Sequence, residues 1–184
     1  PSLSVTNYTD RGFKKAELDK TLFSEIINFY SQNKNDKKRE HIDGNFVYIP
    51  GSKKEASKLI ELPRELKERV HTTLKEPLEK WSNTSLDATF VYGIRVYQEG
   101  AVLVPHRDRE ETHIISAIIN IDQEINEDWP LIIEDHFYRK HELTLKPGEV
   151  LYYESAKLLH GRPVPLNGKS FANIFCHFMP AKDS

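Results

Sequence analysis

Disulfides, membrane spans and a strong charge of one sign are all missing from this sequence. Its one cysteine among 184 residues, Cys176, cannot form an intramolecular disulfide, which favours a reducing compartment. We interpret it as a buried apolar thiol. No run reaches the roughly 18 apolar residues of a membrane helix, and no charged-then-apolar leader opens the chain. The sequence therefore predicts a soluble, cytoplasmic protein with no membrane partner.

The charge balance excludes one further class of protein. The chain has 26 lysines and arginines against 28 aspartates and glutamates, a formal net charge of -2. Nucleic-acid binders use a basic field that this composition does not supply, so no nucleic-acid partner is expected. The 38% hydrophobic and 29% charged content is ordinary for a folded chain. Its length fits one compact domain, predicted over residues 1–184.

The first 85 residues carry the apolar spacing of helices. Between residues 16 and 30, apolar side chains recur at intervals of three and four, which indicates a helix with one buried face. A second such segment begins near Pro63 and continues to Trp81. Pro77 is expected to kink or end it. We therefore predict helical support over about residues 1–85.

After residue 86 the apolar period falls to about two, which is typical of strands. The number of short strands, preceded by helices, predicts a double-sheet jelly roll (a double-stranded β-helix) of α+β or mainly β class over about residues 86–180. Chemistry is expected in the mouth of this barrel. The candidate strands are residues 89–97, 102–106, 113–121, 131–134, 141–145, 150–154 and 170–179.

A candidate metal site lies in this β half. His106 and Asp108 are two residues apart, and in an extended chain that spacing directs both side chains to the same face. His160, at the end of an apolar run, offers a third ligand. Two imidazoles and one carboxylate leave coordination positions open on iron, so Fe(II) is favoured over zinc. Alternatively, Asp108 caps a turn and His160 is a core histidine.

The sequence around these residues resembles the prolyl 4-hydroxylase branch of the 2-oxoglutarate oxygenases. Residues 97–100 (Tyr-Gln-Glu-Gly) precede His106 and Asp108 at the family spacing. Residues 160–164 (His-Gly-Arg-Pro-Val) and 167–169 (Asn-Gly-Lys) are similar to the segment around the family's distal histidine. The turn at residues 145–151 resembles the one that precedes that histidine. The two motif halves occur in the family's order.

The resemblance implies an enzyme that uses Fe(II), 2-oxoglutarate and O2 to hydroxylate an unactivated C–H bond, with release of succinate and CO2. A prolyl residue of a peptide or protein is the leading substrate. Residues 126–131 depart from the family's Gly-Gly segment, however, so a free amino acid or small metabolite stays open as an alternative. A nucleic-acid demethylase is disfavoured by charge, and a non-catalytic jelly-roll binding module is disfavoured by the intact ligand set.

The resemblance also assigns residues to the co-substrate. It pairs Lys169 with the distal carboxylate of 2-oxoglutarate, a buried anion that needs a fixed cation. Arg162 is the competing cation; we expect it to contact substrate or to form a surface salt bridge. Tyr97 matches a family tyrosine that contacts the same carboxylate, although a core aromatic is the alternative reading.

Other side chains are candidates for lining the pocket. Arg95 shares a strand face with Tyr97. Trp129 either forms a stacking wall for substrate or is a buried structural tryptophan. Asn173 and His177 share the strand parity of Lys169.

The remaining histidines are not assigned to the metal. His113 is expected to pack in the core or to support the ligands by hydrogen bonding rather than act as a fourth ligand. Four histidines in polar surroundings are interpreted as surface residues: His41, His71, His136 and His141.

Overall fold

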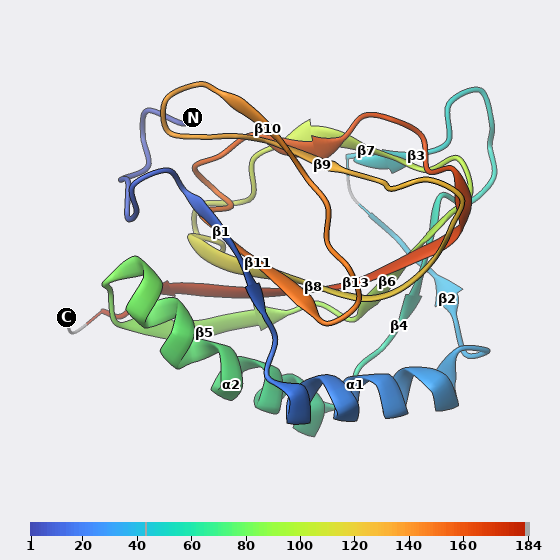
Figure 1. Ribbon diagram of the computed structural model, residues 1–184, viewed down its shortest axis with the longest axis horizontal. Helices are drawn as coiled ribbons and strands as arrows, with labels where there is room; N and C mark the ends of the chain where they lie inside the picture. The colour runs from blue at the N-terminus through green and yellow to red at the C-terminus, as the bar shows by residue number, and fades with distance from the viewer. Residues whose placement is uncertain (43, 183–184) are drawn as a thin grey trace.

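The computed structural model describes residues 1–42 and 44–182 and contains two facing β-sheets with two helices beneath the larger sheet (Figure 1). The helices are α1 (Lys20–Asn33) and α2 (Arg64–Ser82). The strands are β1 (Phe13–Glu17), β2 (Lys38–Arg39), β3 (Val47–Tyr48), β4 (Ser57–Ile60), β5 (Leu86–Val91), β6 (Ile94–Gln98), β7 (Val102–His106), β8 (Ile115–Ile125), β9 (Leu131–Glu134), β10 (Lys140–Leu143), β11 (Glu149–Tyr153), β12 (His160–Arg162) and β13 (Gly168–Pro180).

All the strand pairings found in the described residues are antiparallel. The larger sheet has the order β1-β11-β8-β13-β6-β4-β2, and β5 pairs with the end of the long strand β13. The smaller sheet has the order β10-β9-β12-β7-β3. Two such facing sheets form a jelly roll. The predicted jelly-roll core with N-terminal helices is therefore confirmed.

Strand β8 shows how the larger sheet separates the core from the space between the sheets. Ile115, Ala117 and Ile119 belong to the apolar cluster that includes the helices. Ile118, on the opposite face, joins a different cluster between the sheets. Because both faces are covered there, β8 is buried from Ile115 to Ile121, and the polar residues of this part need partners inside the protein.

The helices follow the apolar spacing of the sequence. Asp19 caps α1 by accepting a hydrogen bond from the Leu22 amide at 2.9 Å. Helix α2 ends at Asn83, which adopts a left-handed conformation with φ 50°. Pro77 was expected to kink or end this helix; it does not end it, since α2 continues to Ser82. Leu74 and Leu78, on either side of Pro77, are buried. Their burial offsets the free-energy cost of the hydrogen bond that proline cannot donate.

Truncation of Leu74 tests this packing. The side chain is 2% exposed within the cluster shared by α2 and the sheet. Leu74→Ala is expected to lower the free energy of unfolding by about 2–5 kcal/mol because it leaves a cavity. Urea denaturation followed by circular dichroism measures the change. Lys75→Ala, at an exposed neighbouring position, is the control, and an equal loss in both variants would contradict the packing argument.

The N-terminal region contributes more than helices. Residues predicted only as helical support also supply β1 at one edge of the larger sheet, β4 and β2 at the other, and β3 in the smaller sheet. These strands are short or at sheet edges, where apolar periodicity is weak. The predicted strand at residues 89–97 divides into β5 and β6 at Gly93, where a Cβ would lie 2.7 Å from the Ile60 carbonyl oxygen.

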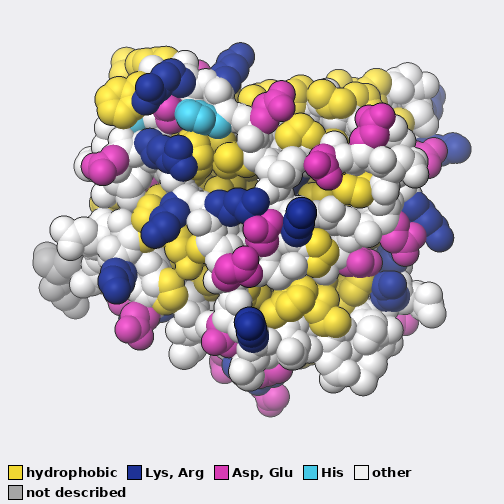
Figure 2. Space-filling view, in the orientation of Figure 1, with side chains coloured by type: hydrophobic (Ala, Val, Ile, Leu, Met, Phe, Trp, Pro, Cys, Tyr) yellow, Lys and Arg dark blue, Asp and Glu magenta, His cyan; other side chains and the backbone are white. Residues whose placement is uncertain are grey.

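The surface agrees with the balanced composition. Figure 2 shows basic and acidic side chains interspersed over the face in view, with no large field of one sign. Cys176 is a buried free thiol, as predicted. Neither α1 nor α2 has the length and apolarity that a bilayer crossing requires.

Candidate active site

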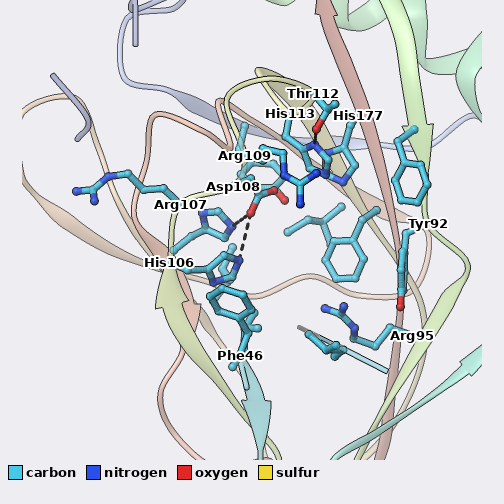
Figure 3. Close-up of a pocket in the computed structure, with 18 of the residues that line it drawn as sticks. Phe46, Tyr92, Arg95, His106, Arg107, Asp108, Arg109, Thr112, His113 and His177 are labelled. Carbon is cyan, nitrogen blue, oxygen red and sulfur yellow. Dashed lines mark hydrogen bonds and ion pairs between the residues drawn. The ribbon is translucent and has the colours of Figure 1, made fainter. Parts of the chain in front are cut away.

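Three side chains predicted as metal ligands meet between the two sheets. His106 ends β7, Asp108 follows it, and His160 begins β12, paired directly with His106 across the two strands. The Nε2 atoms of His106 and His160 lie 3.2 and 3.3 Å from Oδ1 of Asp108 (Figure 3). One ligand atom from each residue lies within 4.8 Å of the others. The sequence spacing and the strand pairing thus converge on one point.

Backbone groups orient the two imidazoles. Nδ1 of His106 is 2.8 Å from the Val104 carbonyl oxygen, and Nδ1 of His160 is 2.8 Å from that of Leu158. A carbonyl oxygen only accepts, so each Nδ1 donates; Nε2 then carries the lone pair in the neutral ring and a proton facing Asp108 in the charged ring. The neutral ring is the tautomer that a metal ligand needs, held by a hydrogen bond from outside the ligand set.

The Asp108 carboxyl is held as an anion. Burial alone raises its pKa, but the charge of His160 and hydrogen bonds from His106 and His160 outweigh this and keep the pKa well below its usual range. The Asp108 amide also donates to the Ser155 carbonyl oxygen at 2.9 Å. The carboxylate is therefore ionised and fixed at neutral pH, as a metal ligand must be.

A second histidine pair faces the same carboxylate. Asp108, His113 and His177 also place ligand atoms within 4.8 Å of one another. The rings of His113 and His177 lie 3.7 Å apart between centroids, with a tilt of 32°. Nδ1 of His177 lies 2.6 Å from the Ser116 hydroxyl oxygen. The rings are thus stacked on each other, whereas those of His106 and His160 are 4.5 Å apart and tilted by 54°.

Both imidazoles of this second pair are neutral at physiological pH. Burial lowers the pKa of His177 to about 3, and the nearby His113 acts in the same direction. Burial also lowers the pKa of His113, against the raising effect of Asp108. Neutral rings can donate or accept hydrogen bonds at the cavity wall without adding charge.

These groups line a cavity of about 770 Å³ between the sheets. Figure 3 shows side chains from both sheets pointing into it, with Phe46 and Tyr92 on different walls. The space is larger than 2-oxoglutarate alone needs, and it falls within the range of small-molecule sites. The residues that line the cavity include Phe90, Arg95, Tyr97, His106, Asp108, Arg109, His113, Tyr153, His160, Arg162 and His177.

Arg162 lies inside this cavity rather than on the surface. Its side chain is 2% exposed, its Nη1 donates to the Trp129 carbonyl oxygen at 2.6 Å, and its guanidinium lies 4.8 Å from the ring centroids of both Trp129 and Phe171. Burial lowers its pKa to about 10, although Tyr97 and Tyr153 act the other way, so it stays cationic at neutral pH. Within the described residues, no carboxylate pairs with it. The expected surface salt bridge for Arg162 is therefore wrong.

Lys169 is placed outside the cavity, so its predicted pairing with 2-oxoglutarate is corrected. Its side chain is 85% exposed and its Nζ lies 3.8 Å from Glu124. The pairing of β13 with β8 passes from Gly168 to Ser170 with a register shift, which leaves Lys169 at an irregularity. Such a bulge re-aims a side chain. The buried inward residue at this end of β13 is Phe171.

The other predicted pocket residues divide between the cavity wall and the core. Arg95 and Tyr97 both line the cavity, and Arg95 Nη1 lies 3.5 Å from the Tyr97 hydroxyl. Trp129 is not among the lining residues; it is 2% exposed and donates from Nε1 to the Val164 carbonyl oxygen at 2.6 Å, which supports its structural reading. Asn173 is buried and accepts from the Asn120 amide at 2.9 Å, also away from the wall.

Several residues of the site were not found from the sequence. Glu40 had no role assigned from the sequence, yet its carboxylate accepts from Arg95 Nε at 3.0 Å and from the Tyr92 hydroxyl. Its side chain is fully buried. Burial lowers the pKa of the Arg95 guanidinium, but the interactions with Tyr97 and Glu40 outweigh burial, so the pKa is raised. Only the fold brings this acid to Arg95, since 55 residues separate them.

Of the histidines interpreted as surface residues, His41 is exposed, as expected, and also lines the cavity. His136 is placed differently. His136 is 8% exposed and lies 2.8 Å from the carboxylate of Glu154, so its expected surface position is wrong.

Comparison with known proteins gives matches at the level of structure. No family model and no curated protein matches the chain. A prolyl 4-hydroxylase from Pseudomonas putida is 11% identical, covers 93% of this chain and 94% of its own, and gives a TM-score of 0.63. SnoN, a non-haem α-ketoglutarate-dependent epimerase from nogalamycin biosynthesis, is 10% identical over 95% of this chain and 81% of its own, with a TM-score of 0.70.

A third structure was solved with ligands bound. HygX from Streptomyces hygroscopicus, with nickel, 2-oxoglutarate and hygromycin B, is 15% identical over 94% of this chain and 84% of its own, with a TM-score of 0.65. These similarities show that the chain has the fold of the 2-oxoglutarate oxygenases.

Proposed function

We propose that this chain is an Fe(II)- and 2-oxoglutarate-dependent dioxygenase that hydroxylates an unactivated C–H bond. The observation that carries the proposal is the meeting of His106, Asp108 and His160 in one cavity with the buried Arg162. Fold similarity alone does not establish an activity; the chemistry of these four side chains is what supports it. The first three residues can bind a metal ion, and Arg162 supplies a cation that can bind an organic acid.

The donor set fits ferrous iron. Two imidazole nitrogens and one carboxylate oxygen are the ligands of the non-haem Fe(II) oxygenases, where the open positions accept further ligands. The two histidines already expose Nε2 toward Asp108. Bound iron and 2-oxoglutarate supply oxidation by O2, with succinate and CO2 as co-products.

The protein's own part is to hold the co-substrate and the target bond in place. We assign Arg162 to the distal carboxylate of 2-oxoglutarate, because a buried guanidinium without an acidic partner matches a buried carboxylate. Tyr97 lies beside it on the cavity wall and is 0% exposed, as is expected of a second donor to the same group. Each interaction in this enclosed space is stronger than it would be in water.

Two substrate classes fit this activity. A prolyl residue of a peptide or protein is supported by the motif resemblance and by the prolyl hydroxylases among the structures of the same fold. A free amino acid or other small metabolite is supported by the size and chemistry of the cavity. A binding module without turnover is the third reading, and the experiment below separates it from the enzymes.

Anaerobic titration of the Fe(II)-loaded protein with 2-oxoglutarate tests the proposal. Chelation is expected to give a weak visible charge-transfer band, which Asp108→Ala should lose because it removes the anionic ligand. On admission of O2, succinate is expected to form. A metal-loaded protein without the band, or one that forms the band but never produces succinate with any peptide or metabolite, would contradict the proposed activity.

A further inference from the structure

Arg109 is held at the cavity mouth directly after a metal ligand. Its carbonyl oxygen accepts from the His113 amide at 2.9 Å and from the Thr112 amide at 3.4 Å, which closes a tight turn. Figure 3 shows its side chain lying over the cavity beside Asp108 and His113, whereas that of Arg107 points away. The turn therefore fixes the backbone of Arg109 beside the proposed metal ligands, and its exposed side chain extends over the cavity.

Apart from Arg107, whose side chain points away, the other charged residues that line the cavity have partners once the proposed ligands are bound. Asp108 is the only acidic residue among the described lining residues, and it is held by the two metal-binding histidines. Arg95 is paired with Glu40, and Arg162 is assigned to 2-oxoglutarate. Across the part of the chain that the structure describes, no acidic side chain forms an ion pair with Arg109. A cation of this kind at the entrance favours an anionic ligand.

The surroundings of Arg109 limit the size of this ligand. Arg109 directly follows Asp108, and consecutive Cα atoms are about 3.8 Å apart. The reach of one arginine side chain therefore limits the distance between an anion on Arg109 and a metal on Asp108, so that one small molecule can contact both. The imidazole of His113 adds a hydrogen-bonding group at the same wall. Phe90 stacks on His113 and His177 with centroids 6.4 and 6.5 Å apart and is 44% exposed, which offers an apolar surface for a carbon chain.

We propose that the substrate is a small carboxylic acid of the free amino acid class, whose carboxylate is bound by Arg109 while its carbon chain packs against Phe90. This inference rests on the proposed oxygenase function and decides between its two substrate classes. In an internal prolyl residue the carboxyl carbon is part of an amide and carries no charge. Such a residue gives Arg109 no anion at this distance from the metal.

The test compares acids with their uncharged amides in the Fe(II)- and 2-oxoglutarate-loaded protein without O2. The twenty free amino acids, their carboxamides and a prolyl peptide blocked at both ends are each titrated while the charge-transfer band is recorded. At least one acid is expected to perturb the band and to bind roughly ten- to hundred-fold more tightly than its carboxamide, the range of a charged hydrogen bond. Arg109→Gln should remove this discrimination. Arg107→Gln, the matched control, should keep it.

Several outcomes would overturn the inference while leaving the oxygenase assignment intact. One is equal binding of acid and carboxamide, and another is an equal effect of Arg109→Gln and Arg107→Gln. A third is a band that no free amino acid perturbs, whether or not the blocked peptide does. The band itself does not require Arg109. Its absence from the wild-type protein would instead contradict the proposed function, and this inference with it.

Discussion

An Arg162→Met variant is expected to need about a hundred-fold more 2-oxoglutarate for half-saturation than the wild-type protein. Removal of one member of a buried, hydrogen-bonded charge pair costs about 2–5 kcal/mol, and each 1.4 kcal/mol is a ten-fold change in affinity. The guanidinium lies against Trp129 and Phe171, and methionine puts an unbranched apolar side chain between the same two rings. The loss should therefore appear in co-substrate affinity rather than in folding.

The anaerobic band titration measures this affinity directly, without turnover. Lys169→Met is the matched control: it also replaces a cation by methionine, but at an 85% exposed position, so its titration curve should match that of the wild type. Arg162→Lys is expected to fall between the two because it keeps the charge and loses the planar fork. A large effect of Lys169→Met with none of Arg162→Met would return the anchoring role to Lys169.

The second large effect concerns the metal. His106→Ala or His160→Ala is expected to lose stable Fe(II) binding and all detectable turnover, since two protein ligands remain. Asp108→Ala should do the same, but Asp108 belongs to both candidate sets and does not distinguish them. The histidines do, because each set has its own pair. His177→Ala should keep the metal at wild-type stoichiometry.

Metal content after anaerobic desalting, together with the charge-transfer band, measures both results. His113→Ala serves as a second control because its ring also faces Asp108 while lying outside the proposed ligand set. Full activity of His106→Ala would remove the proposed triad. Loss of metal from His177→Ala with retention in His160→Ala would move the metal to the stacked pair.

The residues proposed to bind the metal were accessible from the sequence for a local reason. His106 and Asp108 are neighbours on one strand end, so the two-residue period fixes their relative direction before any packing is known. The apolar periods likewise predicted both helices and most strands of the jelly roll. His160 was found through its motif, although β12, the three-residue strand that carries it, was not predicted. A strand this short has too few residues for a periodic signal.

The direction of Lys169 was not accessible in the same way. Strand period predicts a face only while the pairing stays regular, and a shift of one residue reverses every side chain beyond it. The irregularity between Gly168 and Ser170 arises from pairing with β8, a strand more than forty residues earlier. Lys169 therefore matches the family motif in sequence spacing, although its side chain points into solvent.

The sequence by itself determined the features whose information is local: two amphipathic helices, the alternating strands and the shared direction of the proposed ligands His106 and Asp108. Tertiary structure alone decided which charges the cavity holds. It buried Arg162 between Trp129 and Phe171, paired Arg95 with Glu40 and stacked His113 on His177. Each of these contacts joins residues from different strands or loops. Such contacts are set by strand order and register, which no local pattern encodes.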